Sequence, residues 1–292
     1  MKRILITGEG SFVGSSVQTH LKKWPEKYSV TVVGTKDGEW KTFDFSDYDV
    51  VYHVAGLAHS DVGNVSDEVK KLYYAVNCDL AIDVAKKARR EGVKQFIFMS
   101  SAIVYGDSAP IGKDKYISRN TDYMPSNFYG DSKVQAEKGL LPLSSNSFKV
   151  VILRCPMIYG KDGKGNFPIL EKMANKTLFF PKVDNKRSML YVCNLAEFVR
   201  LMIDNEEQGV FWPCNKELSN TSNLVKMIAD CHGRKVYLLS GFGWALKGLS
   251  HFTGYVNKAF GNLAYEDNLG DYKEEYRLYS LSESIIEMET NK

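Results

Sequence analysis

The sequence has few cysteines and prolines, and it contains no long run of apolar residues or of one charge. Its 292 residues include 5 Cys and 8 Pro. The cysteines are odd in number and form no C-x-x-C pair, which argues against a disulfide framework and against a zinc site. We therefore expect reduced thiols, no metal site and a cytoplasmic protein.

Charge and hydropathy exclude two further classes of protein. The formal net charge is only +3 and no five basic residues are consecutive, so nucleic acid is not an expected partner. The longest apolar-rich stretch, from Val236 to Ala245, is too short to span a bilayer. Residues 3–8 lead straight into glycines without an extended apolar region or a cleavage site, so no secretory signal is expected. These features predict a soluble, globular protein.

Short runs of Val, Ile and aromatic residues alternate with helical patterns in the first half of the chain. We expect strands at 4–7, 30–33, 50–54, 95–100 and 150–153, and helices at about 12–23, 66–91 and 130–141. Continuous apolar runs are typical of strands buried on both faces, and their alternation with helices predicts an α/β fold with a doubly wound parallel sheet. Gly, Pro, Lys and Asn become frequent between Lys161 and Lys186. The sheet domain is therefore expected at 1–160. A smaller C-terminal lobe is expected to take up most of 161–292, with the chain returning to the sheet.

The first expected strand runs into a glycine-rich turn, TGEGSFVG at residues 7–14, and a helical pattern follows. Glycine permits a tight turn and a close approach of the backbone to a pyrophosphate, whose charge a helix N-terminus then stabilises. The strand, turn and helix predict the dinucleotide site of a Rossmann domain, with Gly8 and Gly14 in the loop. An ordinary glycine turn is the alternative.

The residue after the second expected strand bears on the choice of cofactor. An acidic residue there takes the adenosine ribose hydroxyl and selects NAD. Here that position is Gly34, followed by Thr35 and Lys36. Glycine removes the carboxylate that would repel a 2′-phosphate, and Thr35 and Lys36 can bind one, which slightly favours NADP. Asp37 restores the ribose contact if the strand ends later, so both NAD and NADP stay open.

Three polar residues form a candidate catalytic set. Ser101 ends a strand, and Tyr129 and Lys133 lie four residues apart at the start of a helix, on one face. A tyrosine hydroxyl has an unperturbed pKa of about 10, and an adjacent ammonium favours its phenolate. Lys133 is expected to supply that charge and Ser101 to hydrogen-bond the substrate oxygen. Tyr129 would then move a proton while hydride passes to or from a nicotinamide.

With these motifs the sequence resembles the extended short-chain dehydrogenases/reductases, and among them the NAD-dependent epimerase/dehydratase family of nucleotide-sugar enzymes related to UDP-galactose 4-epimerase. The resemblance reaches to about residue 200. It is carried, in the family's order, by the glycine loop, the strand end at 54–57, Asn77, the S-S-x-x-V-Y-G run from Ser100, the Y-x-x-x-K run from Tyr129 and LRCPMIYG from Leu153. Two departures are Ser11 in place of the second glycine and the missing acid at Gly34.

The resemblance implies a set of binding residues and partners. The implied cofactor contacts are Ser11, Phe12 and Val13 at the pyrophosphate, Asp44 and Phe45 near the adenine, Ala55, Gly56, Asn77, Ser100, Tyr129 and Lys133 along the cofactor, and Cys155 and Pro156 near the nicotinamide. The implied contacts to a nucleotide-diphospho-sugar are Ser101, Asn166, Phe167 and Arg187. The planar guanidinium of Arg187 suits a diphosphate, although a solvated surface arginine is the alternative. A homodimer through the helices near 70–91 and 130–141 is implied as well.

Residues 244–260 carry an apolar stripe at roughly helical spacing. We interpret this stripe as a lid or core helix. The alternative is an interfacial helix that makes a weak contact with a membrane surface and reaches a lipid-linked sugar.

The leading function is a nucleotide-sugar 4-epimerase, in which hydride leaves the sugar C4 and returns to it. The resemblance to the family also implies a place in polysaccharide biosynthesis. The alternative is an NADPH-dependent 4-keto-sugar reductase, which the missing acid favours. A non-catalytic dinucleotide-binding sensor or scaffold is the second alternative, and the set of Ser101, Tyr129 and Lys133 argues against it. A dehydratase is disfavoured because Ser101, Ala102 and Ile103 stand where the family's dehydratases carry Thr, Asp and Glu.

Overall fold

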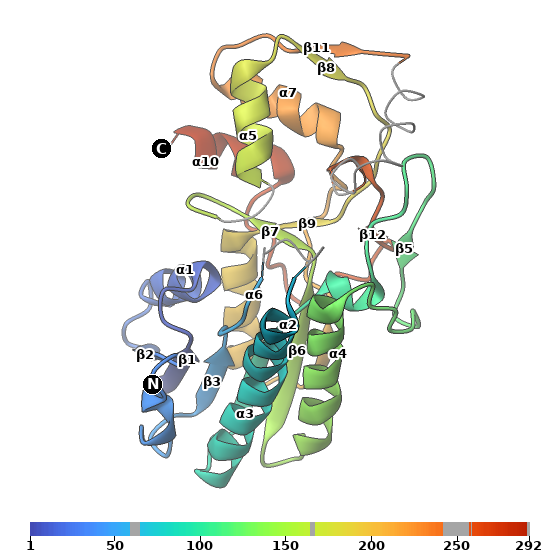
Figure 1. The fold of residues 1–292 in the computed structure, drawn as a ribbon. Helices are drawn as coiled ribbons and strands as arrows, with labels where there is room; N and C mark the ends of the chain where they lie inside the picture. Colours follow the sequence, from blue (N-terminus) through green and yellow to red (C-terminus); the bar gives the residue numbers. More distant parts are fainter. Residues whose placement is uncertain (59–64, 164–166, 242–256, 258, 291–292) are drawn as a thin grey trace. The chain divides into compact units, whose positions relative to one another are not determined.

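The computed structural model describes residues 1–58, 65–163, 167–241, 257 and 259–290, which form two compact units (Figure 1). Unit 1 consists of residues 1–106, 122–155 and 195–213, and unit 2 of residues 107–121, 156–194 and 214–292. Most of the predicted stripe at 244–260 lies outside the described residues. In the described part of the chain, no helix is long and apolar enough to cross a membrane.

Unit 1 is built on a six-stranded sheet with the order β10-β6-β4-β3-β1-β2. All its neighbouring strands run parallel, which confirms the predicted α/β fold and the Rossmann-type sheet. The strands are β1 (Lys2–Thr7), β2 (Tyr28–Val33), β3 (Val50–His53), β4 (Gln95–Ser101), β6 (Lys149–Cys155) and β10 (Gly209–Phe211). Because β2 and β3 lie on opposite sides of β1, the strand order reverses there. The carboxyl ends of β1 and β3 therefore form the topological switch point at which such sheets bind ligands.

Helices cover both faces of this sheet. One face carries α2 (Asp67–Tyr74), the π-helical turn η2 (Ala75–Asp79), α3 (Leu80–Arg90) and α4 (Phe128–Leu140) (Figure 1). The other face carries α1 (Phe12–Leu21) and the part of α6 (Val192–Asp204) that belongs to unit 1. A hydrogen bond of 2.7 Å between His20 Nε2 and Glu197 Oε2 joins these two helices. Short 3-10 turns lie at η1 (Glu39–Lys41), η3 (Ala102–Tyr105) and η4 (Leu141–Leu143).

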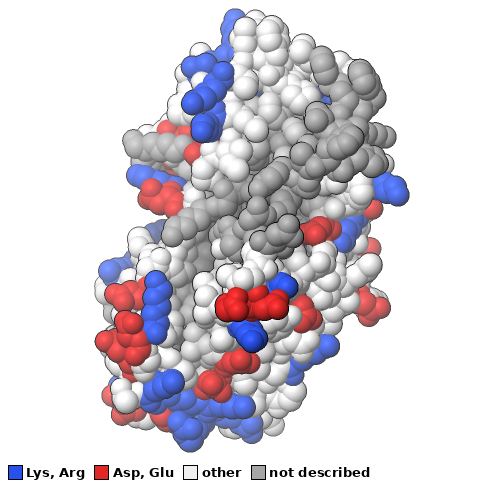
Figure 2. Space-filling model, in the orientation of Figure 1, with Lys and Arg blue, Asp and Glu red and all other residues white. Residues whose placement is uncertain are grey.

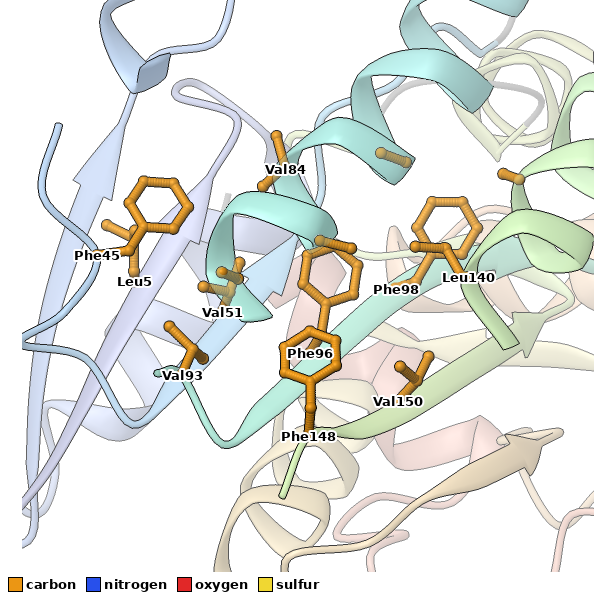
Figure 3. Close-up of a cluster of buried hydrophobic side chains, with 14 of the residues drawn as sticks. Leu5, Phe45, Val51, Val84, Val93, Phe96, Phe98, Leu140, Phe148 and Val150 are labelled. Carbon is orange, nitrogen blue, oxygen red and sulfur yellow. The ribbon is translucent and has the colours of Figure 1, made fainter. Parts of the chain in front are cut away.

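The core under α3 and α4 follows from the alternation of strand side chains. Alternate residues along each strand point to one face, so Phe96 and Phe98 lie on the same side as Val51 and Val150 (Figure 3). All four side chains are fully buried. Val84 on α3 closes the cluster from above, since the predicted apolar spacing of this helix faces the sheet.

The described residues of unit 2 form three short two-stranded sheets and three helices. Strand β5 (Tyr116–Ile117) pairs with β12 (Ala264–Tyr265), β7 (Met157–Tyr159) with β9 (Met189–Tyr191), and β8 (Phe179–Pro181) with β11 (Tyr237–Leu239). The helices are α5 (Phe167–Lys176), α7 (Thr221–Cys231) and α10 (Leu281–Thr290). The Tyr159 hydroxyl links these segments, because it lies 2.5 Å from Ser284 Oγ and accepts a hydrogen bond of 2.8 Å from Asn215 Nδ2.

Candidate active site

The glycine loop lies at the switch point between β1 and β3. Gly8 has a φ of +122°, and a Cβ there would lie 2.6 Å from the Ala55 backbone nitrogen, so only glycine fits. A Cβ on Gly14 would meet Val54 Cγ2 at 3.0 Å, which keeps α1 close to the strand ends. Ser11 is the N-cap of α1 and its hydroxyl accepts a hydrogen bond of 3.3 Å from the Gly14 amide. The serine therefore preserves a helix N-terminus suited to a phosphate.

A carboxylate lies beside the end of β2, although the residue that follows β2 is glycine. Glu9 Oε2 is 3.5 Å from the place where a Cβ on Gly34 would stand. The acid reaches this position from the loop between β1 and α1 instead of from β2. The sequence analysis did not predict this role for Glu9, because it considered only the residues after the second strand. The acidic residue inside the glycine loop was the feature of the sequence that could have indicated it.

The structure brings Ser101 and Tyr129 together. Ser101 ends β4, and its hydroxyl accepts a hydrogen bond of 3.3 Å from the Ile103 amide. Tyr129 lies in the first turn of α4, which Asn127 caps by accepting from the Gly130 amide at 3.0 Å. The side chains of Tyr129 and Ser101 are hydrogen-bonded to each other. Their predicted roles, proton carrier for Tyr129 and substrate-orienting hydroxyl for Ser101, stay predictions.

Burial governs the titration of Tyr129 and Lys133. It raises the pKa of Tyr129 to about 12, although the hydrogen bond with Ser101 acts in the opposite direction. Burial lowers the pKa of Lys133 to about 8, although the negative charge of Glu137 acts to raise it. The ammonium of Lys133 donates to the Met99 carbonyl at 2.9 Å. The structure thus departs from the expectation that Lys133 lowers the pKa of Tyr129, because desolvation of the phenol outweighs the other effects.

Gly56 and Asn77 lie next to Lys133. A Cβ on Gly56 would stand 3.1 Å from Asn77 Oδ1 and 3.4 Å from Lys133 Nζ, so glycine leaves this space open. Asn77 is buried, and three hydrogen bonds hold its side chain. Its Oδ1 accepts from the Leu57 amide at 2.7 Å, and its Nδ2 donates to the Leu57 carbonyl at 3.1 Å and to Ser132 Oγ at 3.2 Å. The two glycine positions that leave little room for a Cβ, the N-terminus of α1 and the nearby Lys133 all lie at the switch point. Together they fit a dinucleotide.

The residues predicted near the adenine and the nicotinamide have different surroundings. Thr35 and Lys36 lie in a bend, separated from β2 by Gly34. Asp44 is exposed, and hydrogen bonds with Ser46 lower its pKa. The ring of Phe45 is fully buried in the core cluster (Figure 3), and its backbone amide donates to Glu91 Oε2 at 2.9 Å. Cys155 is buried opposite Ser101 in the register of β4 and β6.

Four of the predicted binding residues fall within unit 2, and Pro156 is the first residue of its second segment. Phe167 is buried at the start of α5, with its ring stacked on Tyr159 at 5.1 Å between centroids. Arg187 exchanges backbone hydrogen bonds with Ser219, its Nη1 donates to the Gly261 carbonyl at 3.4 Å, and burial lowers its pKa. Asn166 lies outside the described residues. The roles of these residues in substrate binding stay predictions.

A buried ion pair that the sequence reasoning missed supports the catalytic elements. Arg154 Nη2 on β6 lies 2.7 Å from Glu137 Oε2 on α4, and Arg154 Nη1 donates to the Tyr105 hydroxyl at 2.6 Å. Ser100 on β4 and Tyr123 both donate to Glu137. The hydroxyl of Ser100, predicted to line the cofactor, is therefore engaged with Glu137. A glutamate four residues after Lys133, on the same helical face, was the available signal.

His53 is a core residue. Its Nδ1 lies 2.7 Å from Thr7 Oγ1, its ring stacks on Phe96 and Phe98, and burial lowers its pKa to about 3, so the imidazole is neutral. Within the described ranges, no group of three or more His, Cys, Asp or Glu side chains could hold a metal ion.

Comparison with known proteins identifies the relatives of this chain. Residues 4–211 match the family described as the NAD dependent epimerase/dehydratase family. The UDP-glucose 4-epimerase of Vibrio cholerae is 30% identical, and the match covers 84% of this chain and 80% of that protein. The N-acetyl-alpha-D-glucosaminyl-diphospho-ditrans,octacis-undecaprenol 4-epimerase of Escherichia coli O157:H7 is 27% identical, with coverage of 80% and 73%.

Solved structures share the fold. A dTDP-4-dehydrorhamnose reductase from Clostridium acetobutylicum superposes with a TM-score of 0.74 at 20% identity, covering 98% of each chain. A UDP-glucuronic acid 4-epimerase from Bacillus cereus in complex with NAD gives 0.70 at 19% identity, covering 97% of this chain and 94% of that one. Together with the sequence match and the glycine loop, these findings show that the chain belongs to the NAD dependent epimerase/dehydratase family, whose enzymes act on nucleotide sugars with NAD or NADP.

Proposed function

We propose that this enzyme is an NAD-dependent 4-epimerase of sugars carried on a diphosphate. The observation that carries the proposal is the Glu9 carboxylate beside Gly34. An epimerase oxidises and re-reduces one substrate and must retain its cofactor, and a carboxylate at this place accepts a hydrogen bond from the ribose hydroxyl and repels a 2′-phosphate. The glycine after β2 favoured a reductase because it left no carboxylate to repel a 2′-phosphate. Glu9 supplies such a carboxylate, so that argument no longer applies.

The residues of unit 1 that would hold the dinucleotide follow from the geometry. The N-terminus of α1 and Gly8 would take the pyrophosphate, Glu9 the adenosine ribose, and Gly56 with Lys133 the nicotinamide side. A nicotinamide held there would supply the hydride acceptor and donor for oxidation and reduction at the sugar C4. The ammonium of Lys133 has three donors, of which one is used on Met99, so others can reach a ligand.

Proton transfer at the C4 oxygen is assigned to Tyr129. Its hydroxyl is hydrogen-bonded with Ser101, so a C4 oxygen between the two side chains would meet one proton carrier and one orienting hydroxyl. Tyr129 would remove the proton of the C4 hydroxyl during oxidation and return a proton to the C4 oxygen during reduction. Because burial disfavours the phenolate, the transfer needs a nearby cation, and we assign this role to Lys133 on the same helical face, although its charge does not lower the pKa of Tyr129 in this structure.

The relatives leave two kinds of diphosphate carrier for the substrate. Of the two 4-epimerases that match most of this chain, one is named for UDP-glucose and the other for a diphospho-undecaprenol sugar. Both carriers present a diphosphate, which Arg187 suits by its planar guanidinium. The second candidate function, an NADPH-dependent 4-keto-sugar reductase, is favoured by Thr35 and Lys36, which follow Gly34 at the end of β2.

A first experiment is to denature the purified enzyme, identify any released dinucleotide, and incubate native enzyme with UDP-glucose, UDP-N-acetylglucosamine or a polyprenyl-diphospho-N-acetylglucosamine. We expect close to one NAD per chain and, with one of these sugars, the C4 epimer by NMR without added cofactor. Release of no dinucleotide, together with turnover of a 4-keto-sugar only when NADPH is added, would support the reductase instead.

Replacing Glu9 by Gln tests the assignment of the ribose contact. The hydrogen bond to a charged carboxylate is lost, so the affinity for NADH falls by roughly tenfold, while NADPH binds more tightly because the repulsion is removed. Fluorescence titration of both reduced cofactors measures the ratio. Asp37→Asn is the matched control, since Asp37 is the acid that sequence alone offered for this contact. A shift of the ratio in Asp37→Asn and not in Glu9→Gln would contradict the assignment.

A further inference from the structure

The two-stranded sheet of β8 and β11 has one buried face and one exposed apolar face. Phe179 pairs with Tyr237 and Pro181 with Leu239, so these four residues share a side of the parallel ladder. On the opposite side Phe180 is only 5% exposed and packs on Phe260. We call Phe179, Pro181, Tyr237 and Leu239 the β8/β11 face. Within it Phe179 is 57% and Tyr237 52% exposed, and their rings are 6.0 Å apart.

Four basic residues lie next to β8 and β11 in the sequence. Lys176 and Lys182 bracket β8, and Arg234 and Lys235 precede β11; all four are exposed. The sequence has no Asp or Glu between 176 and 182 or between 234 and 239. The neighbouring Leu178 is 55% exposed and adds to the apolar surface. In Figure 2 the described atoms at the top of the view, where Figure 1 draws α5, are white and blue.

Exposed aromatic and aliphatic side chains flanked by lysine and arginine match the physical chemistry of an anionic lipid surface. Aromatic rings favour the level of the lipid headgroups, aliphatic side chains enter the acyl boundary, and basic residues are attracted to negative headgroups. A second copy of this chain fits less well, because a two-fold contact through this face would bring its four basic residues toward four others.

We propose that the β8/β11 face docks unit 2 on the surface of an anionic bilayer, as a peripheral contact. The proposal goes beyond the catalytic function and does not depend on it, since every residue of the face belongs to unit 2 and none belongs to the proposed catalytic set. It uses none of the residues 244–260. A sugar attached to a membrane-embedded diphosphate would be accessible to an enzyme docked in this way, whereas a soluble nucleotide sugar would not require it.

The test measures binding of the full chain to vesicles by sedimentation, without cofactor or substrate. Vesicles of neutral phosphatidylcholine are compared with vesicles containing about one third phosphatidylglycerol, at low and high salt. We expect the wild type to bind the anionic vesicles and to be released by salt. Phe179→Ser combined with Tyr237→Ser lowers binding by about tenfold or more, and Lys182→Gln and Lys235→Gln lower it by roughly fivefold each.

Matched controls come from exposed residues elsewhere. Ile286→Ser changes an apolar side chain of unit 2 that is 53% exposed on α10, and Lys22→Gln removes an exposed lysine of unit 1. Both are expected to bind vesicles like the wild type. The proposal is overturned if wild type binds neither vesicle, or if the double serine variant binds as the wild type does. It is also overturned if that variant only converts a dimer to a monomer in ultracentrifugation. Turnover of UDP-sugars, measured separately, reports on the catalytic proposal alone.

Discussion

The variant Tyr129→Phe is expected to lose about 10³-fold in turnover at the sugar C4 while binding dinucleotide as the wild type does. The change removes one hydroxyl, and with it the group that accepts the proton of the C4 hydroxyl and returns it to the C4 oxygen. Positioned acid–base groups contribute roughly 10²–10⁴-fold to the rate. Ser101 keeps its hydrogen bond from the Ile103 amide, so the end of β4 is not disturbed. Epimerisation followed by NMR and cofactor binding followed by fluorescence measure the two effects separately.

Tyr74→Phe is the matched control for this variant. Tyr74 also carries a hydroxyl that hydrogen-bonds across to α4, where it donates to Asp131 at 2.7 Å, but it takes no part in the proposed chemistry. Its turnover should stay within about twofold of wild type. Full turnover in Tyr129→Phe would disprove the proton-transfer role. A wild type that binds dinucleotide but converts none of the sugars would revive the sensor or scaffold alternative.

The strands of unit 1 could be predicted from sequence because their signal is local. Each of the five predicted strands overlaps a strand of the sheet, since parallel strands buried on both faces leave continuous apolar runs such as Gln95–Ser101. The strands of unit 2 have only two or three residues, too few for any periodicity. Their pairing joins segments far apart in sequence, as in β5 with β12. No local pattern reports such a contact.

The candidate site shows the same division between local and tertiary information. Tyr129 and Ser101 were predicted together from motifs at element ends, and the structure joins them by a hydrogen bond. The position of Glu9 beside Gly34 depends on how the loop after β1 turns, which residue types do not specify. The raised pKa of Tyr129 depends on how much water the surrounding elements exclude. The four-residue spacing to Lys133 suggested a lowered pKa instead, because spacing does not report burial.

Glu137→Gln is expected to lower the free energy of unfolding by about 3–5 kcal/mol, because it leaves the charge of Arg154 buried without its partner. Glu137 is fully buried and Arg154 only 7% exposed, so water cannot replace the lost carboxylate. Urea denaturation measures the change. The control Glu206→Gln breaks exposed ion pairs with Lys2 and Lys149, and it should cost less than about 1 kcal/mol.

A second substitution separates the ion pair from the remaining network. In Glu137→Gln/Arg154→Met no unpaired charge stays buried, so the double variant should be less destabilised than the sum of the two single variants, with a coupling of roughly 1–3 kcal/mol. Strict additivity would mean that Tyr105 and Tyr123, which accept hydrogen bonds from Arg154, satisfy the arginine without Glu137. The coupling therefore distinguishes a charge pair that ties α4 to β6 from a set of independent hydrogen bonds around Arg154.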